Sequence, residues 1–209
     1  PMEHAEASKI ALFSIADYAW NMDAYKSDAS WRRAVRYLMP GHAAALQVFA
    51  SHNSDLGGNE HDFRREESEQ IRPALERLLD AYCREGKREV AAASAVTEEC
   101  ERMIASADLL LASDENPALI KEITPWLMQF KLLGEYGREV LCMLAAQCDG
   151  KKTELEKAAS HAKALQVLMK KIDATYNQNG FQPGVKTGSC HLKPAFDRLY
   201  QEVVQRTGK

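Results

Sequence analysis

Residues 117–149, PALIKEITPWLMQFKLLGEYGREVLCMLAAQCD, contain apolar positions that recur in alternating steps of three and four residues. This spacing is typical of an α-helix that buries one face. The positions of the stripe are Ile120, Ile123, Leu127, Phe130, Gly134, Gly137, Leu141, Leu144 and Cys148. A helix of this length must bury its apolar face against other helices, so the stretch predicts the central helix of a bundle.

The same alternation recurs on both sides of this stretch and predicts an all-α fold. Asn116 followed by Pro117 is a typical helix start, and Gly86 and Gly150 are typical stops. No segment alternates with period two between hairpin turns, so no sheet is expected. We predict a bundle of about five long helices, preceded by two or three shorter ones. The long helices are expected near 63–84, 88–112, 117–149, 151–177 and 191–206, and the shorter ones at 3–19, 28–39 and 41–52.

Two prolines fall within these helical patterns. Thr124 and Pro125 could together cap a new helix, whereas Pro73 is expected in an early turn or at a kink. We expect a bend at one of the two prolines at least.

The composition excludes several classes of function. Twenty-seven Lys and Arg residues against 30 Asp and Glu residues give a net charge of −3, which does not favour nucleic acid as a partner. Apolar runs such as Leu109–Ala112 are much shorter than the roughly 20 residues that a membrane-spanning helix needs. We therefore expect neither a nucleic acid nor a membrane partner, and no targeting signal is evident.

The five cysteines are an odd number, and no two of them have the C-x-x-C spacing. This pattern predicts free, mostly buried thiols rather than a disulfide framework or a zinc ribbon. The chain also begins at Pro1 without an initiator methionine, and a helical pattern starts almost at once. We interpret the chain as a piece of a longer protein.

Metal and cofactor motifs are missing from the sequence. It contains no Glu-x-x-His, H-E-x-x-H or C-x-x-C-H pattern, so we predict no cofactor and no metal ligand. The loop at 53–62 is rich in side-chain oxygens and could gather around calcium, although it does not match the EF-hand template. A structured turn between domains is the favoured interpretation. The six histidines are expected at the surface or in the core: His4, His42, His52, His61, His161 and His191.

Catalytic residues are not predicted either. Cys190 and His191 are adjacent in the chain, but adjacency rarely gives the geometry of a nucleophile held by a base. The acidic clusters Glu66–Glu67 and Glu98–Glu101 resemble solvated helix faces, in which Glu98 would pair with Arg102 one turn away.

Glycines and tryptophans leave two alternatives open. Gly134 and Gly137 could line a ligand cavity, but close approach of a neighbouring helix is favoured. Trp20, Trp31 and Trp126 could stack on sugar rings, but a place in the core is favoured.

Several segments closely resemble glycoside hydrolase family 84, which contains O-GlcNAcases and hyaluronidase-like β-N-acetylglucosaminidases. The resemblance spans nearly the whole chain and is closest to homologues from gut bacteria. The segments that carry it are Pro1 to Lys9, Ala16 to Asn21, His52 to Gly57, Arg64 to Ser68, Glu122 to Trp126, Gln129 to Lys131 and Asn179 to Lys186.

The resemblance implies a retaining, substrate-assisted hydrolase of terminal N-acetylglucosamine, whose two adjacent catalytic aspartates would lie upstream of Pro1. The chain itself contains no Asp-Asp pair. Residues 1–60 would then be the closing helical segment of the catalytic barrel, and 61–209 the post-catalytic helical bundle. The upstream barrel of the same polypeptide would be the partner of this chain. Related bacterial enzymes are commonly exported, so the resemblance also implies an exported parent.

A second hypothesis is an autonomous helical module that binds a protein or a glycan. Ile10, Phe13 and Trp20 are expected on one side of the helix at 3–19, where they would lack the barrel that covers them. This face could also mediate a homo-oligomer.

Overall fold

The computed structural model describes residues 6, 9–52, 63–149, 160–161, 163–172, 174 and 193–207, and these residues form helices and short connections without any strand. The all-α prediction is confirmed. The helices are α1 (Lys9–Trp20), α2 (Ser27–Leu38), α3 (Ala43–His52), α4 (Phe63–Glu85), α5 (Val90–Leu111), α6 (Pro117–Asp149) and α8 (Lys193–Thr207). Residues 160–161, 163–172 and 174 are also helical.

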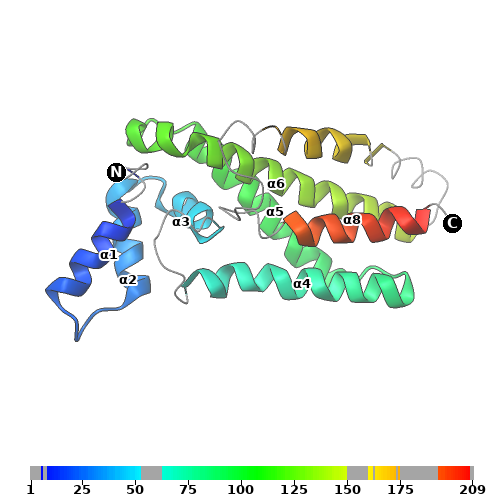
Figure 1. Cartoon of the computed structure of the whole chain (residues 1–209), viewed down its shortest axis with the longest axis horizontal. Helices are drawn as coiled ribbons and strands as arrows, with labels where there is room; N and C mark the ends of the chain where they lie inside the picture. The colour runs from blue at the N-terminus through cyan, green and yellow to red at the C-terminus, as the bar shows by residue number, and fades with distance from the viewer. Residues whose placement is uncertain are drawn as a thin grey trace.

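The helices form an elongated bundle with a helical hairpin at one end (Figure 1). The hairpin consists of α1 and α2, which pack against each other, while α3 packs mainly against α5. The long helix α6 contacts both α5 and α8, and α4 contacts α5 and α8 on the other side. One hydrophobic core therefore runs through the described chain, from Ile10 to Val203.

Local signals in the sequence explain where several helices begin and end. The Asn116 side chain accepts a hydrogen bond from the Leu119 backbone N–H at 3.3 Å and so caps α6, as predicted. Glu89 caps α5 in the same way through the Ala92 N–H at 2.6 Å. Gly86 follows α4 with a φ of +66°, a conformation that glycine adopts without strain, so the predicted stop is confirmed.

Both prolines lie inside helices, so Thr124 and Pro125 do not cap a new helix and the continuous helix predicted at 117–149 is confirmed. Pro125 removes one backbone donor from α6, and the Thr124 hydroxyl donates to the Ile120 carbonyl at 2.6 Å. The buried residues Ile123 and Leu127 flank the proline, so tertiary packing keeps the helix continuous. Pro73 lies in α4, and the bend expected at one of the prolines stays a prediction.

The first helix begins later than predicted, at Lys9 rather than residue 3. Glu6 lies in a turn whose carbonyl accepts the Lys9 N–H at 3.2 Å, and its own N–H donates to the Glu122 carboxylate. This long-range hydrogen bond joins the turn before α1 to α6. The predicted boundary loop at 53–62 lies outside the described residues. Within the described helices, none is both long and apolar enough to cross a membrane.

The two glycines of α6 allow neighbouring helices to approach closely, as favoured above. A Cβ atom on Gly134 would lie 3.0 Å from the Cys100 carbonyl oxygen of α5. A Cβ on Gly137 would lie 2.5 Å from Phe196 Cζ and 2.7 Å from Cys100 Sγ. Helices α5 and α8 therefore both pack against α6 through positions that only glycine can occupy without a shift.

We predict that Gly137→Ala lowers the free energy of unfolding by roughly 1–3 kcal/mol, because the new methyl group overpacks the junction of three helices. Urea unfolding followed by circular dichroism measures this loss. Phe196→Leu is the matched second variant, since it removes the ring atoms that the methyl group meets. The effects of the two substitutions should be less than additive, and full additivity would contradict this packing.

Candidate functional site

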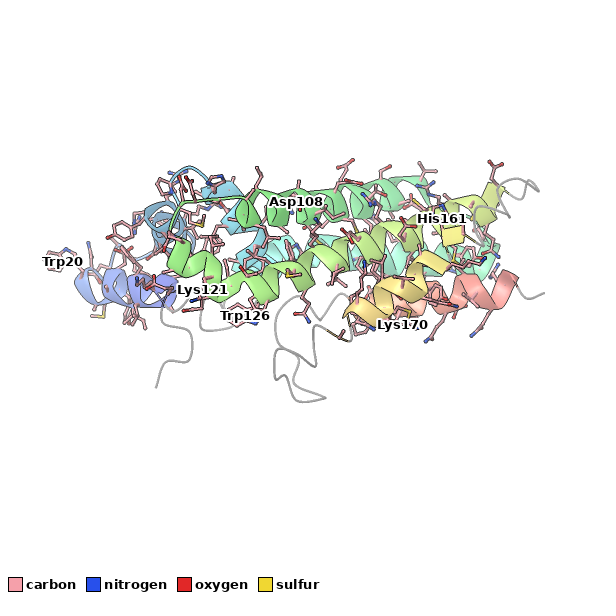
Figure 2. All side chains as sticks on the ribbon, turned by 90° about the horizontal axis from the view of Figure 1, so that it is seen from above. Trp20, Asp108, Lys121, Trp126, His161 and Lys170 are labelled. Atoms are coloured by element: carbon pink, nitrogen blue, oxygen red, sulfur yellow. The ribbon has the colours of Figure 1, made fainter. Side chains whose placement is uncertain are left out.

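The described histidines each pair with a carboxylate. His42 Nδ1 lies 3.2 Å from Glu115 Oε2. His161 Nδ1 lies 2.6 Å from Glu139 Oε2, where the helical segment that includes residues 160–161 and 163–172 runs beside α6 (Figure 2). His52 pairs with Glu99, as described below. Within the described part of the chain, no group of three or more His, Cys, Asp or Glu side chains could hold a metal ion. His4, His61 and His191 lie outside the described residues.

His52 forms the most buried of these pairs. Its Nε2 atom lies 2.5 Å from Glu99 Oε1, and its ring packs against Phe130 with the centroids 5.5 Å apart. Arg102 Nε donates to the other oxygen of Glu99 at 2.9 Å. Burial would raise the pKa of Glu99, but the hydrogen bond from His52 and the charge of Arg102 outweigh it and lower the pKa. The three side chains join α3 to α5.

The acidic cluster on α5 differs in detail from the prediction. Arg102 pairs with Glu99, three residues away, rather than with Glu98. Glu99 is the better partner because His52 already holds its carboxylate on the α3 side of the helix. Glu101 lies 3.4 Å from Arg138 on α6. The side chains of Glu66 and Glu67 lie outside what the structure describes.

The described cysteines are free thiols, as predicted. Cys100 is fully buried, Cys142 and Cys148 are partly buried, and Cys83 is exposed. Burial raises the pKa of Cys100 to about 12, and it also raises the pKa values of Cys142 and Cys148. These thiols stay protonated near neutral pH, which makes them poor nucleophiles. Cys190 lies outside the described residues.

The three tryptophans have different surroundings. Trp126 is buried and Trp31 packs against the core, so the favoured prediction is confirmed for both. Trp20 is 91% exposed, and the prediction that it belongs to the core is wrong. Figure 2 shows Trp20 at the end of α1, pointing away from the bundle. It is the last residue of α1, seven residues after Phe13 and on the same side of the helix.

The outer face of α1 is the largest set of exposed apolar side chains on one described helix. Ile10 and Phe13 point inward, where Phe13 stacks on Tyr37 of α2 with ring centroids 4.8 Å apart. The expectation that they lie on the uncovered side is therefore wrong. The exposed apolar residues of α1 are Leu12, Ile15, Ala16, Tyr18, Ala19 and Trp20. Helical periodicity places Leu12, Ile15, Ala16 and Ala19 together on the outer face, whereas Trp20 lies on the Phe13 side at the end of the helix.

Two carboxylates that sequence reasoning missed connect the first helices to the bundle. Glu122 Oε2 accepts the backbone N–H of Glu6 at 3.1 Å, and Glu115 accepts the backbone N–H of Gly41 at 2.9 Å. No local pattern could indicate these contacts, because the partners are 116 and 74 residues apart in the chain.

Comparison with known proteins identifies the family. The family model described as "Bacterial GH84, post-catalytic domain" matches residues 67–200, which is more than half of the chain. The chain therefore belongs to this family of glycoside hydrolase family 84 helical domains. A second model, described as beta-N-acetylglucosaminidase, matches residues 1–51.

Solved structures agree with the family. CpGH84D is 27% identical with a TM-score of 0.75, and the match covers 98% of this chain and 34% of that one. CpGH84B is 20% identical with a TM-score of 0.74, covering 95% of this chain and 32% of that one. A mutant O-GlcNAc hydrolase of Thermobaculum terrenum is 20% identical with a TM-score of 0.72, covering 100% of this chain and 42% of that one. The chain thus spans 32% to 42% of the length of these proteins.

We predict that Glu99→Gln destabilises the chain at pH 7 by roughly 1–3 kcal/mol, because it removes the carboxylate charge that both His52 and Arg102 contact. The pKa of Glu99 is lower in the folded chain than its ordinary value of 4.5, so its contribution is complete above that pH. The contribution is lost as the pH falls through the lowered pKa. Thermal unfolding between pH 3 and pH 7 measures it.

The matched control is Glu101→Gln, which removes an exposed carboxylate from the same helix. Its effect should be small at every pH, as is usual for surface pairs. An equal loss of stability in both variants, or a Glu99→Gln effect that grows in acid, would contradict the role of the buried pair.

Proposed function

We propose that this chain is the non-catalytic C-terminal part of a retaining, substrate-assisted β-N-acetylglucosaminidase of the O-GlcNAcase or hyaluronidase-like type, and that it buttresses the catalytic barrel. Residues 1–60 would close the barrel, and 61–209 would form the supporting bundle. The observation that carries this proposal is the exposed apolar outer face of α1, within a segment that matches the acetylglucosaminidase model.

The two sides of α1 support this arrangement. Its inner side packs against α2 and the core, and its outer side exposes Leu12, Ile15 and Ala19. A helix that is apolar on both sides is typical of a buried layer between two other layers. The bundle supplies one of these layers, and the preceding barrel would supply the other.

The chemistry of the described side chains favours a structural role over a catalytic one. The described histidines pair with carboxylates from other parts of the chain, as His52 of α3 does with Glu99 of α5. The described thiols have raised pKa values. In this proposal the catalytic residues lie in the polypeptide that precedes residue 1.

We predict that the purified 209-residue chain does not hydrolyse 4-nitrophenyl N-acetyl-β-glucosaminide, whereas the longer polypeptide with the preceding barrel does. Release of nitrophenolate measures both. Hydrolysis by the chain alone would contradict the proposal, and so would a preceding sequence that encodes no barrel.

The alternative is an autonomous helical module that binds a protein or glycan, or a second copy of itself, through the same face of α1. The exposure of Trp20 and its neighbours favours this alternative if the face stays uncovered in the complete protein. The two proposals differ in what covers the face.

We predict that Ile15→Lys leaves the stability of the 209-residue chain within about 0.5 kcal/mol, because Ile15 is 62% exposed. In the longer polypeptide the same substitution should lower the unfolding temperature, since it would bury a charge between α1 and the barrel. Val167→Lys is the matched control, because Val167 is 53% exposed on another helix. It should be tolerated in both proteins.

Light scattering distinguishes self-association through α1 from packing of α1 against the barrel. If the 209-residue chain self-associates and Ile15→Lys makes it monomeric while the longer polypeptide tolerates the substitution, the face is a site for a second copy and the buttress proposal is wrong.

A further inference from the structure

The segment that matches the acetylglucosaminidase model is tied to the helical domain by hydrogen bonds to its backbone. Glu122 Oε2 accepts the N–H of Glu6 at 3.1 Å, immediately before α1. The two oxygens of Glu115 lie 2.9 and 3.2 Å from the Gly41 nitrogen, in the turn between α2 and α3. Both donors belong to residues 1–51, and both acceptors belong to residues 67–200.

A carboxylate that accepts a backbone N–H fixes the path of the chain, whatever the side chain at that position. Such hydrogen bonds are charge-assisted and stronger than those between neutral groups. Glu115 precedes α6 and Glu122 lies in its second turn, so one helix carries or adjoins both acceptors. We call Glu115 and Glu122 the carboxylate clamp.

Gly41 is adapted to its place in the clamp. A Cβ atom at this position would collide with the Glu115 carboxylate, so only glycine lets the carboxylate reach the backbone this closely. His42 adds a second contact, with its Nδ1 atom 3.2 Å from Glu115 Oε2.

Glu115 is itself held in place by its own turn. Its N–H donates to the Ser113 hydroxyl at 3.1 Å, and the Asn116 amide donates to the Leu38 carbonyl at 3.4 Å. The α2–α3 and α5–α6 turns are therefore interlocked through several polar contacts. Apolar packing acts beside these contacts, through Phe49 against Phe130 in α3 and through the buried Ile10 near the start of α1.

We propose that Glu115 and Glu122 are positioning residues through which the helical domain sets the place of the last segment of the catalytic domain. Glu122 holds the chain where it enters α1, and Glu115 holds the turn that leads into α3. The consequence for catalysis rests on the proposed function, whereas the clamp itself is a property of this chain and can be tested in it.

The first experiment is hydrogen exchange on the 209-residue chain with Glu122→Ala and Glu115→Ala. Exchange of the α1 amides should quicken about tenfold in the first variant, and that of the amides at 39–43 in the second. Gly41→Ala should reproduce the Glu115→Ala result, because its methyl group displaces the same carboxylate. Glu101→Ala, which removes a carboxylate between α5 and α6, should change neither segment.

The thermal unfolding midpoint is measured on every variant, so that a general loss of stability is not mistaken for loss of the clamp. Local acceleration with an unchanged midpoint supports the clamp. Unchanged exchange in both alanine variants overturns it, and so does an acceleration spread evenly over all helices.

The second experiment uses the longer polypeptide that includes the barrel and measures kcat and KM separately on the aryl N-acetylglucosaminide. Glu122→Ala should lower kcat about fivefold to tenfold with a smaller change in KM. Glu122→Gln should recover most of the loss, because its amide oxygen still accepts the Glu6 N–H. An unchanged kcat overturns the positioning role. An inactive wild-type polypeptide overturns the proposed function instead, while the exchange experiment still decides on the clamp.

Discussion

The close contact of α5 and α8 with α6 at Gly134 and Gly137 is the constraint on which the rest of the fold depends. Because neither glycine has a side chain, Cys100 and Phe196 fill the space beside the α6 backbone. The buried ring of Tyr136 lies beside this junction, and its hydroxyl donates to Asp197 at 2.8 Å. Side chains therefore fill the space beside these two glycines, and the three helices meet in close contact there.

The first three helices are attached to the rest of the bundle in different ways. Helix α3 belongs to the core, where Phe49 meets Phe130 and His52 meets Glu99. Helices α1 and α2 lie at the end of the bundle (Figure 1), and the hydrogen bonds of Glu6 and Gly41 join the segments beside them to Glu122 and Glu115. The described part of the chain therefore has a rigid interior and an end that presents an apolar face, which suits a domain that supports another one.

Local chemistry made most helix positions predictable. The stripe from Ile120 to Cys148 places α6 within its observed bounds, and Asn116 and Gly86 mark ends that need no information from elsewhere in the chain. Pro125 normally breaks a helix, but the apolar stripe predicted a continuous helix through it, and Ile123 and Leu127 on either side of the proline are buried. Prediction failed at the first helix, where Trp20 was expected in the core and is 91% exposed. Glu6 fits a helical pattern but lies in a turn, where its N–H donates to Glu122.

The periodicity of apolar residues and the capping residues near them establish the all-α fold, because both act within a few turns of one helix. The resemblance of short segments to family 84 likewise needs no coordinates. Which side of α1 faces outward, and which carboxylates reach Glu6 and Gly41, follows only from the folded chain. These features join residues that are 74 and 116 positions apart, and no local pattern encodes how the chain brings them together.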